Sequence, residues 1–289
     1  MAIVLGLPKG SLQESTFALF RRAGFNVTCS SRSYVPSIDD DEISCRLLRP
    51  QEMSRYVELG LLDAGICGYD WVCENGSDVQ EICELNYSKA TSNPVRWVLA
   101  VPNDSKIKSV KDLEGKRIST EAMGLVRRYL KKNGVKADVE FSWGATEVKA
   151  PELVDAIVDL TETGSSLRAN NLRIVDTILT STTRFIANRK SWRNAAKRAK
   201  MEQLKMLLTG ALEAQRRVLL KCNAPAKSLA KVVKTLPALH APTVNKLNDA
   251  DWFAVESVVE ERKVRDLIPA LTRCGATGII ELPLNKIIF

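Results

Sequence analysis

The feature of this sequence that most constrains its fold is a repeated alternation of short apolar runs with longer amphipathic stretches. The first run, residues 2–7, precedes a helical pattern over 11–23 that ends at Gly24. A second helical pattern covers 51–59. Further strands are expected at 25–30, 43–48 and 64–68. Strands that alternate with helices indicate an α/β protein whose sheet is covered by helices.

A second alternating segment begins near residue 93. Its predicted strands are 95–101, 116–119, 137–141 and 157–159, and its predicted helices are 109–113 and 125–132. After Thr183 the chain is expected to return to the first sheet through a strand at 185–188. A long helical pattern then covers 191–217, with Thr209-Gly210 as the candidate break.

The last segment has its own order of elements. Strands are expected at 218–223, 243–247, 252–259 and 278–282, and helices at 226–236 and 263–274. Strand, helix, strand, strand, helix, strand is the βαββαβ order of ferredoxin-like domains. The 289 residues suit two or three domains. We predict one domain from 1–92 and 182–212, a second from 93–181 and a third from 213–289.

Composition narrows the classes of function. The net charge of +8 favours anionic partners. The only histidine, His240, argues against multi-histidine metal sites and is expected to be a surface residue. Seven cysteines without a C-x-x-C pair suit reduced thiols in a cytoplasmic protein. We expect no signal peptide and no membrane span, because the apolar N-terminus is short and no apolar run reaches about 18 residues.

The charge excess concentrates between Arg184 and Lys205, where eight basic residues face one acidic residue, Glu202. A solvated helix face or an oligomer contact explains such a run. Nucleic-acid binding is the alternative. It is disfavoured because the run lacks interleaved aromatic residues apart from Trp192 and because no recognisable nucleic-acid-binding module surrounds it. We therefore expect no nucleic-acid partner.

The segment after the strand at 157–159 carries the strongest chemical signal. The strand ends in Asp159, and a hydroxyl-rich turn with one glycine leads into a helix. Backbone N–H groups and hydroxyls at such a turn can bind a phosphate, and Asp159 can accept hydrogen bonds from sugar hydroxyls. A plain helix cap is the alternative, since Ser and Thr favour that position. The predicted phosphate loop consists of Thr161, Glu162, Thr163, Gly164, Ser165, Ser166 and Leu167.

This loop resembles the phosphoribosyl-diphosphate loop of phosphoribosyltransferases, and no Walker-type motif is present. The wider sequence is similar to the ATP phosphoribosyltransferase family, in its long form with a C-terminal regulatory domain. The segments that carry this resemblance are Gly6–Leu12, Leu48–Pro50, Gly60–Asp70, Gly115–Glu121, Gly144–Val148, Ala241–Thr243 and Gly275–Ala276. The loop has Ser166 where many relatives have threonine, and both supply a hydroxyl.

The resemblance implies a fold and a reaction. Two catalytic domains of the type II periplasmic-binding-protein kind would enclose an active-site cleft, followed by a ferredoxin-like, ACT-like regulatory domain. The enzyme would join phosphoribosyl diphosphate to N1 of ATP and release pyrophosphate, the first step of histidine biosynthesis. The resemblance also implies Mg²⁺, feedback inhibition by histidine, and a homodimer–homohexamer equilibrium.

It further implies residue roles. Lys9 would act at the pyrophosphate and Asp159 at the ribose, with Asp155 a weaker candidate; no side chain is assigned to the metal. Arg49 and Asp70 would lie on the ATP side, with Glu121 nearby but outside the catalytic set. The histidine effector would bind near Asn223, Leu239, Thr243 and Ala276.

Each role has a plainer alternative. Lys9 would be an exposed turn residue, Asp70 a helix cap, and Asp155 a partner of a neighbouring strand. For the whole chain, the alternatives are a solute-binding protein, a nucleic-acid-binding regulator, and a phosphoribosyltransferase with a different acceptor base.

Overall fold

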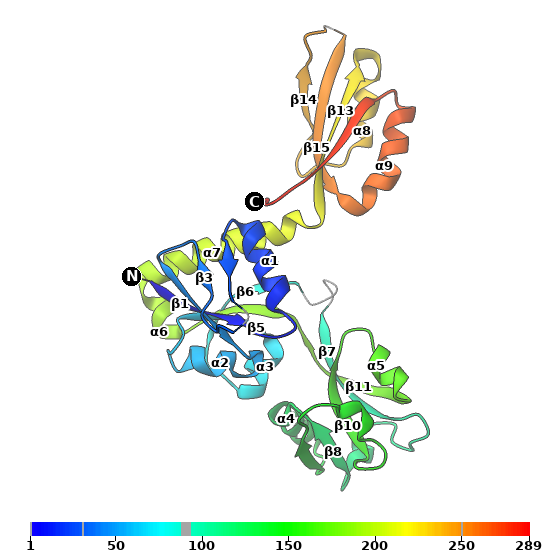
Figure 1. Cartoon of the computed structure of the whole chain (residues 1–289). Helices are drawn as coiled ribbons and strands as arrows, with labels where there is room; N and C mark the ends of the chain where they lie inside the picture. Colours follow the sequence, from blue (N-terminus) through cyan, green and yellow to red (C-terminus); the bar gives the residue numbers. More distant parts are fainter. Residues whose placement is uncertain (1, 31, 88–93, 250) are drawn as a thin grey trace. The chain divides into compact units, whose positions relative to one another are not determined.

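The computed structural model describes residues 2–30, 32–87, 94–249 and 251–289. The chain divides into two compact units, 1–18 with 25–205 and 19–24 with 206–289 (Figure 1). The boundaries fall inside the helices α1 (Gln13–Ala23) and α7 (Ala195–Ala214). The domain ranges given above stay a prediction, and each unit is described by itself.

The first unit contains a five-stranded sheet in the order β4-β1-β5-β12-β6. Its strands are β1 (Ile3–Pro8), β4 (Ile43–Leu48), β5 (Ala64–Gly68), β6 (Gln80–Leu85) and β12 (Thr183–Ala187). β1 is parallel to β4 and β5, whereas β12 is antiparallel to β5 and β6. The expected return of the chain to this sheet is confirmed. Helix α2 (Pro50–Glu58) packs so closely that a Cβ on Gly6 would lie 2.3 Å from the Met53 sulfur.

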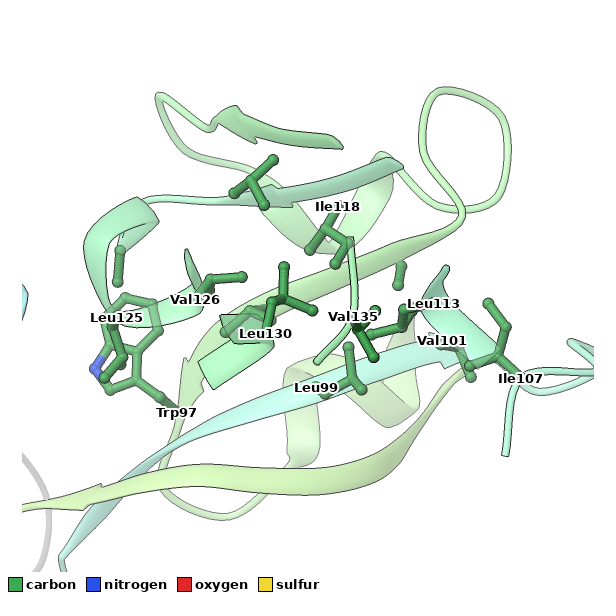
Figure 2. Packing of buried hydrophobic residues seen from close by; sticks show 14 of the residues in the cluster. Trp97, Leu99, Val101, Ile107, Leu113, Ile118, Leu125, Val126, Leu130 and Val135 are labelled. Carbon is green, nitrogen blue, oxygen red and sulfur yellow. The ribbon is translucent and has the colours of Figure 1, made fainter. Parts of the chain in front are cut away.

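The same unit contains a second five-stranded sheet in the order β11-β7-β10-β8-β9. Its strands are β7 (Val95–Pro102), β8 (Arg117–Thr120), β9 (Asp138–Phe141), β10 (Ala156–Thr161) and β11 (Leu172–Ser181). Helix α4 (Met123–Asn133) covers it, and Figure 2 shows the apolar core between them. Leu125 and Leu130 of the helix pack with Trp97 and Leu99 of β7. Burial of such side chains is the main source of stability here.

The second unit contains a four-stranded sheet in the order β14-β15-β13-β16. The strands are β13 (Arg217–Pro225), β14 (Thr243–Lys246), β15 (Trp252–Glu260) and β16 (Thr277–Pro283). Helices α8 (Leu229–Thr235) and α9 (Glu261–Arg273) lie beside the sheet (Figure 1). The buried residues of both helices form one apolar core with those of the sheet. The βαββαβ order and the central position of β13 confirm the ferredoxin-like prediction.

Several elements differ from their sequence-based prediction. The strand expected at 25–30 is only β2 (Val27–Thr28), paired with β3 (Ser37–Ile38). The helical pattern breaks at Asn194, between α6 (Arg189–Arg193) and α7, and not at Gly210, which lies inside α7. Asn194 has an extended backbone, and its side chain accepts a hydrogen bond from the Lys197 N–H. That capping contact starts a new helix.

Among the elements of the first unit that were not predicted are the strands β3, β6 and β11 and the helix α3 (Tyr69–Asn75). Strand β11 pairs with β7 through two shifts of register, so its side chains do not alternate regularly between faces. In the described parts of the chain, no helix is both long and apolar enough for a membrane span.

Candidate active site

A cavity of about 370 Å³ lies in the first unit, between residues of its two sheets. The first sheet and its helices contribute Lys9, Arg49 and Asp70, and the second contributes Thr161 and Glu162. The structure thus brings together five predicted site residues from four segments that are widely separated along the chain. Further polar lining comes from Ser11, Gln51, Glu121 and Thr182.

Lys9 follows β1, and its backbone N–H donates to the Leu48 carbonyl at 2.8 Å. Its Nζ lies 3.5 Å from the centroid of the Tyr34 ring. A hydrogen bond with Lys9, together with its positive charge, lowers the pKa of Tyr34. An aromatic ring can hold an ammonium group without neutralising its charge. The contact therefore orients the Lys9 side chain.

Arg49 lies beside the turn that follows Lys9. It is the residue before α2, with an extended backbone. A Cβ built on Gly10 would lie 3.6 Å from Arg49 Nη1, so the guanidinium group lies against this turn. Two cationic side chains therefore line the same part of the cavity wall, which favours an anionic ligand.

Asp70 is buried and joins three elements. Its Oδ2 accepts a hydrogen bond from Trp97 Nε1 at 2.8 Å, and its Oδ1 accepts one from Ser181 Oγ at 2.8 Å. The residue before α3 is Gly68, so the predicted helix-cap alternative for Asp70 is not what the structure shows. Instead, the carboxylate ties the first turn of α3 to β7 and β11.

The predicted phosphate loop joins β10 to the short helix α5 (Ser165–Ala169). Gly164 has a positive φ of 74°, which favours glycine. Its N–H donates to Thr161 Oγ1 at 2.8 Å, and Arg168 Nη1 donates to the Thr163 carbonyl at 3.0 Å. Leu167 is buried, so only its backbone can serve a ligand. The loop is shaped by its own hydrogen bonds, and Thr161 and Glu162 reach the cavity.

Of the two candidate aspartates, Asp155 directly precedes β10, and Asp159 lies within β10, two residues before its end. Asp159 precedes Leu160, which lines the cavity, and burial raises the pKa of Asp159 to about 6, with repulsion from Glu147 and Glu121 adding to the effect. Asp155 instead accepts a hydrogen bond from the Arg117 N–H at 3.0 Å and pairs with Lys116 at 3.3 Å. These contacts agree with the plainer alternative for Asp155, in which its carboxylate binds the neighbouring strand, here at the start of β8.

One contact across the cavity was not predicted. Gln51 Nε2 of α2 donates to Glu121 Oε1 at 2.9 Å, and Glu121 follows β8. Both side chains line the cavity. Tyr34, Gln51 and Ser181 were missed because none belongs to a motif; the hydroxyl run 180–183 at the end of β11 was the only available signal.

The candidate effector residues lie in the second unit. In the sheet, Asn223 of β13 is opposite Thr277 of β16, which follows the buried Ala276. Thr243 begins β14 and is opposite Glu256 of β15. Leu239 is exposed in the segment before β14. Strand pairing therefore places Asn223 of β13 close to Ala276, which directly precedes the neighbouring strand β16. Thr243 lies on β14, which β15 separates from β13.

The basic run is largely neutralised by acidic partners. Five of its eight basic residues form ion pairs, including Lys197 with Asp63 and Lys200 with Asp40. This pairing favours a structural role over phosphate contacts. Among the described residues, no group of three or more His, Cys, Asp or Glu is arranged to hold a metal ion.

Comparisons with known proteins agree on one family. The family profile described as ATP phosphoribosyltransferase matches residues 49–210, and the one described as HisG, C-terminal domain, matches 214–286. An ATP phosphoribosyltransferase of Thermodesulfovibrio yellowstonii is 58% identical over 98% of this chain and 97% of its own. One of Pelotomaculum thermopropionicum is 57% identical over the full length of both. The solved ATP phosphoribosyl transferase (HisG:HisZ) complex from Thermotoga maritima contains a chain with a TM-score of 0.61 and 28% identity, covering 72% of this chain and 98% of that one.

Proposed function

This chain belongs to the ATP phosphoribosyltransferase family, and from that premise we propose how its cavity carries out the reaction. The chain transfers the 5-phosphoribosyl group from phosphoribosyl diphosphate to N1 of ATP and releases pyrophosphate, the first step of histidine biosynthesis. The observation that carries the site assignment is the single cavity that unites Lys9 and Arg49 with Thr161 and Glu162.

Phosphoribosyl diphosphate would lie against the second sheet. The loop 161–167 would hold its 5-phosphate through backbone N–H groups and hydroxyls, with Glu162 acting through its backbone because its carboxylate repels phosphate. Asp159 would accept hydrogen bonds from the ribose hydroxyls. Binding would draw the Gly164 N–H away from Thr161 Oγ1, so the phosphate replaces an existing acceptor at an already formed turn.

The bond from C1 to the pyrophosphate oxygen breaks as the N1 lone pair of ATP forms the new C–N bond. Positive charge develops on the ribose ring, and negative charge grows on the leaving pyrophosphate. Lys9 would stabilise the pyrophosphate. Mg²⁺ would arrive bound to phosphoribosyl diphosphate, as part of the substrate, and would neutralise the leaving group. The attacking nitrogen has a free lone pair, so no histidine base is needed.

ATP would lie against the first sheet. Arg49 would contact its phosphates, since a guanidinium group matches phosphate oxygens. Asp70 would serve ATP indirectly, because both of its oxygens already accept hydrogen bonds that anchor α3. The cavity would hold the two reacting atoms close together, which accounts for a large share of the rate of a two-substrate reaction.

Regulation, assembly and location complete the proposal. Histidine would bind the second unit near Asn223, Leu239, Thr243 and Ala276 and inhibit the enzyme. The chain would exchange between a homodimer and a homohexamer. It would work in the cytoplasm, where its seven free cysteines stay reduced.

A coupled assay tests the reaction. Purified protein would be mixed with ATP, phosphoribosyl diphosphate, Mg²⁺ and pyrophosphatase, and the absorbance of phosphoribosyl-ATP followed with and without histidine. We expect a signal that requires both substrates and falls when histidine is added. Replacing ATP with GTP or a free base is the control. Turnover with the replacement but not with ATP would point to a different acceptor.

A further inference from the structure

Helices α3 and α4 belong to opposite sides of the cavity, and their ends meet. The Glu74 carboxylate, in the last turn of α3, accepts hydrogen bonds from the backbone N–H groups of Gly124 at 2.8 Å and Leu125 at 2.6 Å. Helix α4 lacks a cap of its own, because the residue before it is Ala122. Glu74 thus supplies the cap, and its negative charge lies at the positive end of the helix.

The contact is reciprocal. The Arg128 guanidinium of α4 donates to the carbonyls of Cys73 and Glu74 in the last turn of α3, with the distances to the Glu74 oxygen at 3.5 Å. A cation beside the last carbonyls of a helix stabilises its negative end. Each helix therefore satisfies free backbone groups at the end of the other. We call Glu74, Gly124 and Arg128 the α3–α4 clasp.

Gly124 makes this close approach possible. A Cβ at this position would lie 2.8 Å from the Glu74 carbonyl oxygen, which is too short for real contacts. Alanine is otherwise the better helix residue. Position 124 is therefore glycine although helix propensity alone would favour alanine there, because the contact with Glu74 leaves no room for a Cβ.

We propose that the α3–α4 clasp sets the distance between the two sides of the cavity, and that Glu74 and Arg128 are positioning residues for the reaction. Helix α3 carries Asp70 and Trp71 of the cavity wall, and Glu121 of the cavity wall lies two residues before the start of α4. A rigid joint between the helices fixes these groups relative to one another. Since the two substrates would bind on opposite sides, it also fixes the separation of C1 and N1. The catalytic part of this inference rests on the proposed function.

Four variants test the clasp, with Arg127→Ala as the matched control. Arg127 is the neighbour of Arg128 in α4 and is also exposed, and among the described residues it makes no hydrogen bond or ion pair with α3. Glu74→Ala, Arg128→Ala and Gly124→Ala should each speed amide hydrogen exchange at Gly124 and Leu125. They should also raise the KM of both substrates and lower kcat/KM by about tenfold to a hundredfold, since small misplacements of reacting groups are costly. Arg128→Lys, which can donate to the same carbonyls, should recover most of the loss.

Gly124→Ala gives the sharpest outcome because its Cβ would push the Glu74 carbonyl away and open the clasp. If the clasp does not position the substrates, this substitution would speed hydrogen exchange at the clasp but leave both KM values unchanged. That result, or unchanged exchange in Glu74→Ala and Arg128→Ala, would overturn the proposal. Hydrogen exchange needs no substrate, so it reports on the clasp even if the assay of the proposed function fails.

Discussion

At the scale of the residue, the negative charge of Asp159 is unfavourable for folding but is the form of the side chain that the proposed ribose contact uses. Burial raises the pKa of its carboxyl to about 6, above the ordinary value of 3.8, so the folded protein holds this proton more tightly than the unfolded chain. The charged form is therefore unfavourable to folding above that pH. A group kept charged in such surroundings is typical of a binding or catalytic site.

We expect Asp159→Asn to raise the melting temperature at pH 8 while lowering kcat/KM by about tenfold to a hundredfold, the effect of losing a charged acceptor to the ribose. The gain in stability should shrink as the pH falls through 6 towards 4, because the wild-type carboxyl then becomes neutral. Thermal unfolding across this range and the coupled assay measure both effects. A variant that is less stable than wild type at pH 8 would contradict the account.

Tyr34 is a second case at this scale, because its ring supports the Lys9 ammonium. Tyr34→Leu should raise the KM for phosphoribosyl diphosphate about two- to fivefold, the range for an exposed cation–π contact. Tyr34→Phe keeps the ring and is the matched control, so it should stay close to wild type. Equal effects of both variants would assign the role to the hydroxyl instead.

At the scale of the element, one buried carboxylate holds α6 and α7 against the first sheet. Asp63 accepts hydrogen bonds from the Val4 N–H at 2.9 Å and Lys197 Nζ at 2.6 Å, as well as from Ser191 Oγ. Burial on its own would raise the pKa of Asp63, but the hydrogen bonds from Lys197, Ser191 and Val4 outweigh it and lower the pKa. The contribution to stability is present above pH 4 and is lost as the pH falls through the lowered value.

Asp63→Asn should therefore lower the free energy of unfolding by about 1–3 kcal/mol at neutral pH, measured by urea denaturation. The control is Asp78→Asn, which breaks the exposed ion pair with Arg189. Exposed pairs contribute less than about 1 kcal/mol. Equal losses in the two variants would show that the buried network adds nothing beyond an ordinary ion pair.

At the scale of the whole molecule, the second unit is the candidate sensor of the end product. If histidine binds near Asn223, Asn223→Ala should raise the histidine concentration needed for half inhibition by about tenfold, the effect of losing one hydrogen bond to a ligand. Turnover without histidine is the reference in the same assay. An unchanged inhibition curve would place the effector elsewhere.

The sequence alone determined the features that depend on neighbouring residues. Periodicity and turn residues located most strands and helices, the loop 161–167 and the βαββαβ order of the last segment. Strand β11 was not predicted from the sequence because register shifts interrupt the alternation of its side chains. The helix break lies at Asn194, and not at Gly210, because the capping contact of Asn194 outweighs the low helix propensity of glycine.

Tertiary structure decided which distant groups meet. Asp70 is 27 residues from Trp97 and 111 from Ser181, and Asp155 turned out to face Lys116 and Arg117 at the far end of β10. Glu74 and Arg128 cap helices that are not their own. Such contacts depend on which strands are neighbours in a sheet and how closely helices approach. No local pattern encodes either, because each is set by the packing of the whole unit.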